Sequence, residues 1–223
     1  MSRMLRYGLW LWMSAVIVWS LTGAPVAQGF EGLYGESPQT SRIVYFHVPV
    51  AIASFIGFLA AGVWSIRYLI SRRPSFDRAA VAAVEVGVIF CVLAIVTGAM
   101  WAQVQWGAAW NWDPRQTSIV LALLFYLAYL SLRGAIDDSE TRARLSSAYA
   151  SLGLVVSPMM FFILPRMMGP SLHPKPASAE FDPAIGVTLL AAVIGFTAIF
   201  FWCQNLRRRQ LALASVALEG RRA

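Results

Sequence analysis

The chain has two histidines, His47 and His173, and imidazole is the commonest side-chain metal ligand in proteins. His47 stands in the stretch HVPV, where Pro49 predicts a helix start because proline is favoured in the first turn. His173 stands between a leucine and a proline, in a segment that we expect to be extended. Two histidines are too few for zinc, which takes three or four protein ligands, but they complete the coordination of a haem iron. The simpler alternatives are an interfacial capping role for His47 and a solvated loop position for His173.

Three tryptophans occur within seven residues in the stretch WGAAWNWDPRQTS, where the charged residues Asp113 and Arg115 follow them, so the stretch is no membrane span. Trp106, Trp110 and Trp112 offer indole faces that stack on a flat aromatic ligand. Trp106 and Trp110 share a face if the segment is helical, because they are four residues apart. An aromatic belt at the membrane surface is the alternative for these rings.

Charged residues around this stretch suit a flat ligand with carboxylates at one edge, which is the character of haem. Arginine donates paired hydrogen bonds to a carboxylate, and Arg42 and Arg115 are the best candidates for that contact. Arg166 and Lys175 are further candidates. Asp113 either belongs to the ligand site or pairs with Arg115 and shapes the turn, and we favour the turn.

The composition places the chain among integral membrane proteins. It has 223 residues, of which 58% are hydrophobic and only 13% are charged. Soluble domains carry about a quarter charged residues. The two cysteines, Cys91 and Cys203, lie in apolar runs and form no C-x-x-C or C-x-x-C-H motif. The chain is therefore neither a thiol oxidoreductase nor a cytochrome with covalent haem.

Six apolar stretches are long enough to cross a bilayer, which takes about 20 residues. We expect an all-α bundle, one membrane domain over residues 1–223, with the ligand-binding segment at 101–118 between the third and fourth spans. The first span is expected to be retained, because Pro25-Val26-Ala27 is a poor signal-peptide cleavage site. The predicted spans are 7–27, 47–68, 83–104, 117–132, 146–165 and 184–206.

The basic residues predict the orientation of these spans, because cytoplasmic loops carry an excess of lysine and arginine. Fourteen of the 18 basic residues fall on one side, so both termini are predicted to be cytoplasmic. Both histidines and the tryptophan-rich stretch then lie on the outer side. This topology explains the net charge of +7, so the charge does not indicate a nucleic-acid partner. Glu85 is expected to lie at the membrane surface with its carboxylate paired. No chain of ionisable groups therefore crosses the predicted spans, which argues against a proton-coupled transporter.

The motif WGxxWxWD between two spans, followed by arginine and Thr-Ser, resembles the tryptophan-rich WWD domain of haem-handling proteins in cytochrome c maturation. The stretch SRIVYFHVP, the six spans and one outer histidine on each flank resemble the haem exporter protein C family, from about residue 40 to the last span. The resemblance implies a haem b, bound transiently and without a covalent bond. Its axial ligands would be His47 and His173, and the remaining contacts would be Trp106, Gly107, Trp110, Trp112, Asp113, Arg115 and Arg42.

The resemblance also implies a task and a set of partners. The family holds haem on the outer face of the bacterial cytoplasmic membrane and loads it onto a membrane-tethered haem chaperone. It works in the lipid bilayer beside a small single-span subunit and the subunits of an ABC transporter. We expect a haem-handling transporter or chaperone without catalytic residues, with haem lyase activity as the alternative.

Two departures from the family pattern keep other functions open. Ala109 stands where many members carry another aromatic residue, which thins one wall of the proposed site. The stretch DPRQT resembles the synthase branch, whose members attach haem directly to apocytochrome. That branch has a further histidine pair within its spans, and this chain has no histidine left for one, which favours the exporter C branch. A haem–apocytochrome ligase, an ABC-type haem permease subunit and an assembly scaffold are the competing functions.

Overall fold

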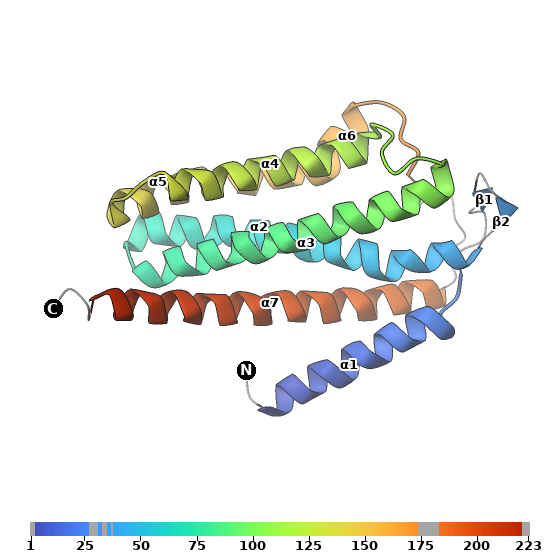
Figure 1. The fold of residues 1–223 in the computed structure, drawn as a ribbon, viewed down its shortest axis with the longest axis horizontal. Helices are drawn as coiled ribbons and strands as arrows, with labels where there is room; N and C mark the ends of the chain where they lie inside the picture. Colours follow the sequence, from blue (N-terminus) through green and yellow to red (C-terminus); the bar gives the residue numbers. More distant parts are fainter. Residues whose placement is uncertain (1–2, 27–30, 33–34, 37, 174–182, 220–223) are drawn as a thin grey trace.

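The protein is described by a computed structural model that covers residues 3–26, 31–32, 35–36, 38–173 and 183–219 (Figure 1). Six helical segments are long and apolar enough to span a membrane, which confirms the predicted all-α membrane fold. A 3-10 helix, η1 (Pro38–Ile43), leads into α2, and a two-residue antiparallel ladder pairs β1 (Glu31–Gly32) with β2 (Gly35–Glu36). The helices are α1 (Arg3–Thr22), α2 (Val44–Ser71), α3 (Pro74–Trp106), α4 (Pro114–Gly134), α5 (Ser139–Pro158), the π-helical η2 (Met159–Ile163), α6 (Leu164–Met167) and α7 (Pro183–Glu219).

Several helices extend beyond the spans predicted from the sequence. α3 begins at Pro74 rather than near residue 83, and α7 continues to Glu219 rather than ending near residue 206. At 1.5 Å per residue these helices are about 50 and 55 Å long, whereas the hydrocarbon core is about 30 Å thick. Apolar composition marks only the part of a helix that lies in lipid, so it underestimates the helix itself. Pro74 starts α3 because its fixed φ suits the first helical turn.

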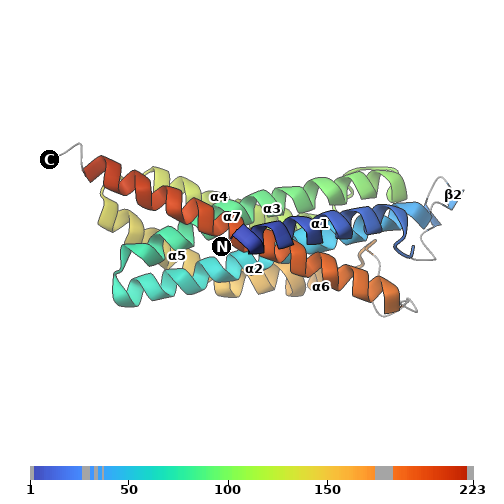
Figure 2. The ribbon, with the colours of Figure 1, turned by 90° about the horizontal axis from the view of Figure 1, so that it is seen from below.

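α2 and α3 form the centre of the bundle, with α4 and α5 on one side and α7 on the other (Figures 1 and 2). The core between them is rich in aromatic residues: Phe58 of α2 stacks on Tyr126 of α4 with 3.7 Å between ring centroids. α1 packs mainly on α7 at the edge of the bundle. There the indole Nε1 of Trp19 donates a hydrogen bond of 3.1 Å to Thr188 Oγ1.

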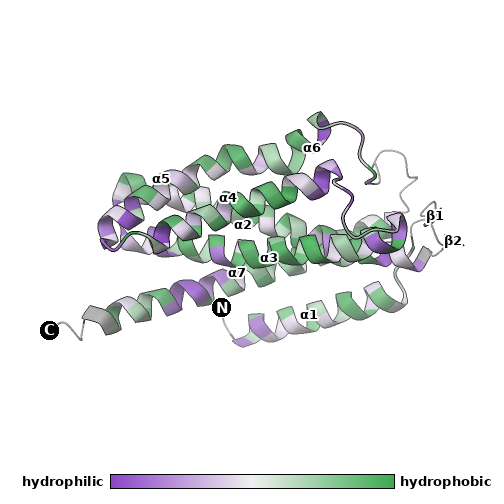
Figure 3. Cartoon of the chain, turned by 45° about the horizontal axis from the view of Figure 1, so that its top comes forward, coloured by the Kyte–Doolittle hydropathy of each residue, from purple (hydrophilic) through white to green (hydrophobic). Residues whose placement is uncertain are grey.

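Hydrophilic residues gather at the two ends of the bundle (Figure 3). We call the end with the α2–α3 and α4–α5 connections the arginine end, and the end with the α3–α4 loop the tryptophan end. Two ion pairs join helices at the arginine end, Arg133–Asp77 and Arg207–Glu85, each with an N–O distance of 2.7 Å. The pairing of Glu85 agrees with its expected role as a satisfied residue rather than a proton carrier.

Candidate functional site

Residues 107–113 of the tryptophan-rich stretch form a loop, which joins Trp106 at the end of α3 to Pro114 at the start of α4. α3 ends at Trp106, where Gly107 has a φ of 75°, a left-handed conformation that glycine adopts without strain. The helical face that Trp106 and Trp110 would have shared therefore does not form. Trp112 also has a positive φ, 53°, which is uncommon for a bulky residue, and it is 76% exposed.

Asp113 joins this loop to the segment that carries His173. Its carboxylate is fully buried and caps α4 by accepting a hydrogen bond of 2.8 Å from the backbone N–H of Arg115. It also accepts hydrogen bonds from Ser171 Oγ at 2.9 Å, from the Leu172 backbone N–H at 2.7 Å and from His173 Nδ1 at 2.8 Å. Burial alone would raise the pKa of Asp113, but these hydrogen bonds and the nearby imidazole outweigh burial and lower that pKa. Asp113 is therefore an anion that shapes the turn and fixes the ring of His173.

His47 faces the same region from α2. It is the fourth residue of α2, so Pro49 lies in the second turn and not in the first, because the helix begins at Val44. His47 Nδ1 is 3.0 Å from Thr97 Oγ1 of α3, and the Thr97 hydroxyl donates to the carbonyl of Leu93 at 2.7 Å. A hydroxyl whose one hydrogen is engaged can only accept, so the hydrogen between the two side chains belongs to His47 Nδ1.

Both imidazoles therefore engage Nδ1 in a hydrogen bond, which leaves Nε2 to bind a ligand. The carboxylate of Asp113 can only accept, so His173 also carries its hydrogen on Nδ1. Burial lowers the pKa of His173 and the Arg115 cation lowers it further, which together outweigh the opposite effect of Asp113. His173 is thus neutral at neutral pH. A neutral imidazole whose Nδ1–H is held by an oxygen is the usual state of a histidine that binds a metal through Nε2.

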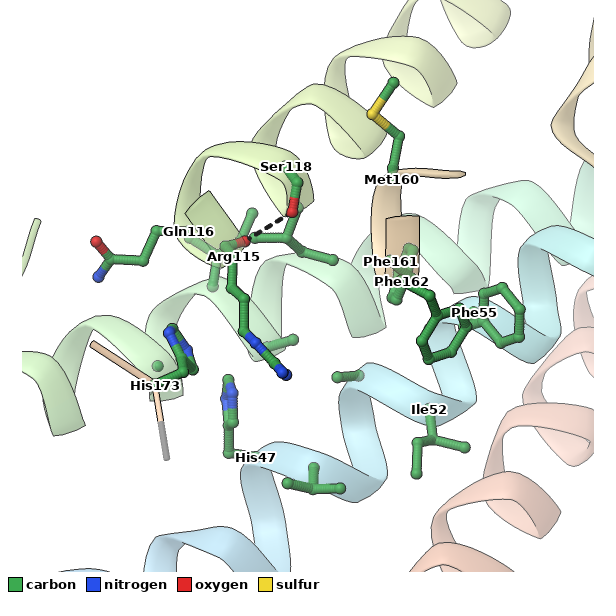
Figure 4. A pocket seen from close by; sticks show the side chains of 16 residues that line it. His47, Ile52, Phe55, Arg115, Gln116, Ser118, Met160, Phe161, Phe162 and His173 are labelled. Carbon is green, nitrogen blue, oxygen red and sulfur yellow. Dashed lines mark hydrogen bonds between the residues drawn. The ribbon is translucent and has the colours of Figure 1, made fainter. Parts of the chain in front are cut away.

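The two rings open on one cavity of about 290 Å³ at the tryptophan end (Figure 4). Figure 4 shows them next to one another, with the side chain of Arg115 reaching beside them from α4. His47 packs on Gly98 of α3, where an added Cβ would lie 2.9 Å from its ring. None of the three ion pairs among the described residues includes Arg115. The deeper wall of the cavity is apolar and includes Ile52, Phe55, Ile95, Ile119, Phe161 and Phe162.

Only some of the predicted aromatic residues adjoin the histidines. Trp106 meets the ring of His173 edge-on, with 5.2 Å between ring centroids. Trp101 contacts Trp106 at 5.1 Å and lies 6.4 Å from His173. Trp110 and Trp112 contact one another at 5.6 Å, further along the loop. The indoles thus form two pairs. Trp101 and Trp106 lie next to His173, whereas Trp110 and Trp112 form a separate pair in the loop.

The predicted cationic residues are also divided. Arg115 lines the cavity. Arg42 is not among the residues that line it; its Nη1 donates a hydrogen bond of 3.0 Å to the carbonyl of Ser20, which ties η1 to α1. Arg166 donates to a backbone carbonyl one turn earlier. Lys175 lies outside the described residues.

These features define a polytopic helical membrane protein in which two imidazoles from distant segments face one apolar cavity beside a tryptophan-rich loop. A family model described as Heme exporter protein C matches residues 2–220. The chain belongs to the haem exporter protein C family.

Individual relatives are similar over long parts of the chain. A protein named Heme exporter protein C from Paracoccus denitrificans is 30% identical over 226 residues, covering 93% of this chain and 92% of the relative. A protein of the same name from Rhodobacter capsulatus is 36% identical over 139 residues, covering 62% of this chain and 54% of the relative. That match therefore spans about half the length of the Rhodobacter protein. A putative cytochrome c biosynthesis mitochondrial protein of Marchantia polymorpha is 29% identical over 183 residues, covering 80% of this chain and 77% of the relative.

Proposed function

We propose that the protein binds haem b in this cavity and passes it to a membrane-tethered haem chaperone during cytochrome c maturation. The observation that carries the proposal is the pair of imidazoles, each with Nδ1 in a hydrogen bond and Nε2 left to bind iron. Its relatives carry the name Heme exporter protein C, which supports haem as the ligand and haem delivery as the role.

The residues of the cavity fit haem. The porphyrin supplies four nitrogens to the iron, and His47 and His173 would supply the two axial ligands. The apolar wall suits the ring, and the guanidinium of Arg115 suits a propionate, to which it can donate two hydrogen bonds. A bare metal ion fits less well, because the described residues include no cluster of three or more histidine, cysteine, aspartate or glutamate side chains that could hold one.

The size of the cavity supports transient binding. Its volume of about 290 Å³ is at the low end of pockets that enclose drug-sized ligands, which measure about 300–1,000 Å³. A porphyrin therefore leaves one edge outside the cavity, where an acceptor protein can reach it. In this proposal Trp101 and Trp106 extend the wall beside His173, and Trp110 and Trp112 contact only the protruding part of the ring.

We place the cavity on the outer face of a bacterial inner membrane. Among the described residues, twelve arginines lie toward the arginine end and three toward the tryptophan end, and such an excess marks the cytoplasmic side. Both ends of the chain lie toward the arginine end (Figure 1). Reporter fusions test this placement: a reporter in the α3–α4 loop is expected to be active only on the outer side, and cytoplasmic activity would contradict it.

Replacement of Asp113 by alanine is expected to reduce haem affinity by about 10- to 100-fold, the usual cost of losing the partner that orients a metal-binding histidine. The substitution leaves the N–H groups of Leu172 and His173 without their acceptor. Haem titration of the haem-free protein measures the effect. Asp137→Ala is the control, because Asp137 is exposed in the α4–α5 connection at the other end. Equal affinities of the two variants would show that Asp113 does not position the ligand.

Esterified haem is expected to bind about tenfold more weakly than haem itself, because haem dimethyl ester has no carboxylate for Arg115 to contact. In Arg115→Gln the difference between the two ligands should disappear. The relative affinities are measured by letting haem and haem dimethyl ester compete for the protein at equal concentrations. A preference for the free acid that persists in Arg115→Gln would assign the propionate contact to another residue.

Transfer of haem tests the proposed function as a whole. Purified haem-loaded protein is mixed with the haem-free soluble domain of a haem chaperone, and the haem on each is measured after separation. The proposal predicts that haem lost from the protein appears on the chaperone. If apocytochrome accepts the haem covalently while the chaperone gains none, the protein acts as a ligase and the proposal is wrong.

A further inference from the structure

We infer that Arg115 makes the cavity selective for the charge of its ligand, so that the two imidazoles reject a free divalent cation and accept a metal held in an anionic porphyrin. The inference rests on the proposed function, because it takes haem as the ligand. It concerns a property of the haem-free protein, however, and can be tested without haem.

Two imidazoles that face one cavity are a potential site for free metal ions. Imidazole binds Zn²⁺, Ni²⁺ and Cu²⁺ as well as iron, so the ring nitrogens alone do not select haem. The orientation of both rings is fixed by Thr97 and Asp113, so a metal ion would meet an arrangement that is already formed. Something else in the cavity must discriminate between haem and a free ion.

No carboxylate lines the described cavity to favour a cation. Asp113 is an anion, but it is not among the lining residues: it lies behind the ring of His173, where it accepts the hydrogen bond from Nδ1. Among the described residues that line the cavity, Arg115 is the one with a charged side chain, a cationic guanidinium. A metal ion on the two Nε2 atoms would therefore meet the Arg115 cation directly, and the Asp113 carboxylate only through the ring of His173.

The position of Arg115 allows its charge to discriminate between a free cation and an anionic ligand. Its side chain lies beside both rings in Figure 4, and none of the ion pairs among the described residues neutralises it. A free divalent ion bound to the imidazoles would be repelled by this charge, and a separation of about 6 Å would lower its affinity by about tenfold even in a water-like dielectric. A haem molecule brings two propionates, so the same guanidinium attracts it.

Zinc binding to the haem-free, full-length protein tests the inference. The protein is purified in detergent with a tag that contains no histidine, and Zn²⁺ is titrated in competition with a chromogenic chelator. Wild type and Arg115→Lys, which keeps the charge, are expected to bind Zn²⁺ weakly. Arg115→Gln should gain at least about tenfold in affinity. Arg115→Glu should gain more, because two histidines and one glutamate are a known set of zinc ligands.

The gained affinity must come from the two imidazoles. Adding His47→Ala to Arg115→Glu should return zinc affinity to the wild-type level. Arg166→Gln is the matched control, because it removes another arginine of the tryptophan end that does not line the cavity, and it should leave zinc affinity unchanged. A circular dichroism melt of each variant verifies that it is folded.

Three results would overturn the inference. They are tight zinc binding by the wild type through His47, an unchanged zinc affinity in both Arg115→Gln and Arg115→Glu, or an equal gain in Arg166→Gln. In any of these cases the proposed function still stands if the wild type binds haem. If the wild type binds no haem, the proposed function fails whatever the zinc titration shows.

Discussion

Haem bound to the purified protein is expected to fall by more than about tenfold when either His47 or His173 is replaced by alanine. The physical reason is the loss of one of two axial bonds to iron, which costs more than the 10- to 100-fold effect of disturbing a partner of a metal ligand. The haem content per protein, measured from the absorbance of a pyridine haemochrome extract, gives the result. Neither substitution removes a packed apolar side chain, so we expect both variants to fold.

A chemical rescue separates ligation from a structural role. Glycine in place of either histidine leaves space for a free imidazole, which should restore haem binding when added at millimolar concentration. An alanine variant of either histidine that retains the haem content of the wild type would show that this histidine is not an axial ligand. Failure of imidazole to restore binding in both glycine variants would point to a structural role.

Leucine in place of Gly98 is expected to abolish haem binding almost completely. Gly98 lines the cavity, and even a Cβ at this position would lie 2.9 Å from the ring of His47. The larger leucine side chain therefore displaces His47 and fills the space that the porphyrin needs. Gly98→Ala should have an intermediate effect, because only the ring of His47 must shift. Haem titration of the haem-free variants measures both effects.

The matched control is Gly186→Leu. Gly186 also lies in a helix toward the tryptophan end, but it is exposed and has nothing within 4 Å of an added Cβ. This variant should bind haem as the wild type does. If Gly98→Leu binds haem with the affinity of Gly186→Leu, haem is bound elsewhere than in the cavity.

The sequence was sufficient to predict the six spans, for reasons that lie in composition. A span needs only a long apolar run, and six such runs are present. His47 and His173 were predicted to act together because both fall on the predicted outer side and two imidazoles complete the coordination of a haem iron, and the resemblance to a haem-handling family supported this. That they share one cavity depends on the packing of α2 against α3 and of the His173 segment against Asp113. Contacts of this kind join residues far apart in the chain, and neither composition nor periodicity records them.

Three parts of the site could not be predicted from the sequence. The positive φ of Gly107 ends α3 and separates the tryptophans into two pairs, which the spacing of four residues does not reveal. Thr97 and Gly98 lie inside a span and are ordinary residues there, so their contact with His47 emerges only from helix packing. Trp101 lies near His173, but it falls within the predicted span 83–104, where nothing in its spacing marks it as a site residue.

Electron paramagnetic resonance of the ferric haem-loaded protein tests the central claim most directly. The protein is produced with ¹⁵N-labelled histidine, and the couplings of the iron spin to the labelled nitrogens are measured in frozen solution. We predict a low-spin iron coupled to the nitrogens of two histidines, His47 and His173. A high-spin iron, or a spectrum with one labelled ligand or none, would contradict the account.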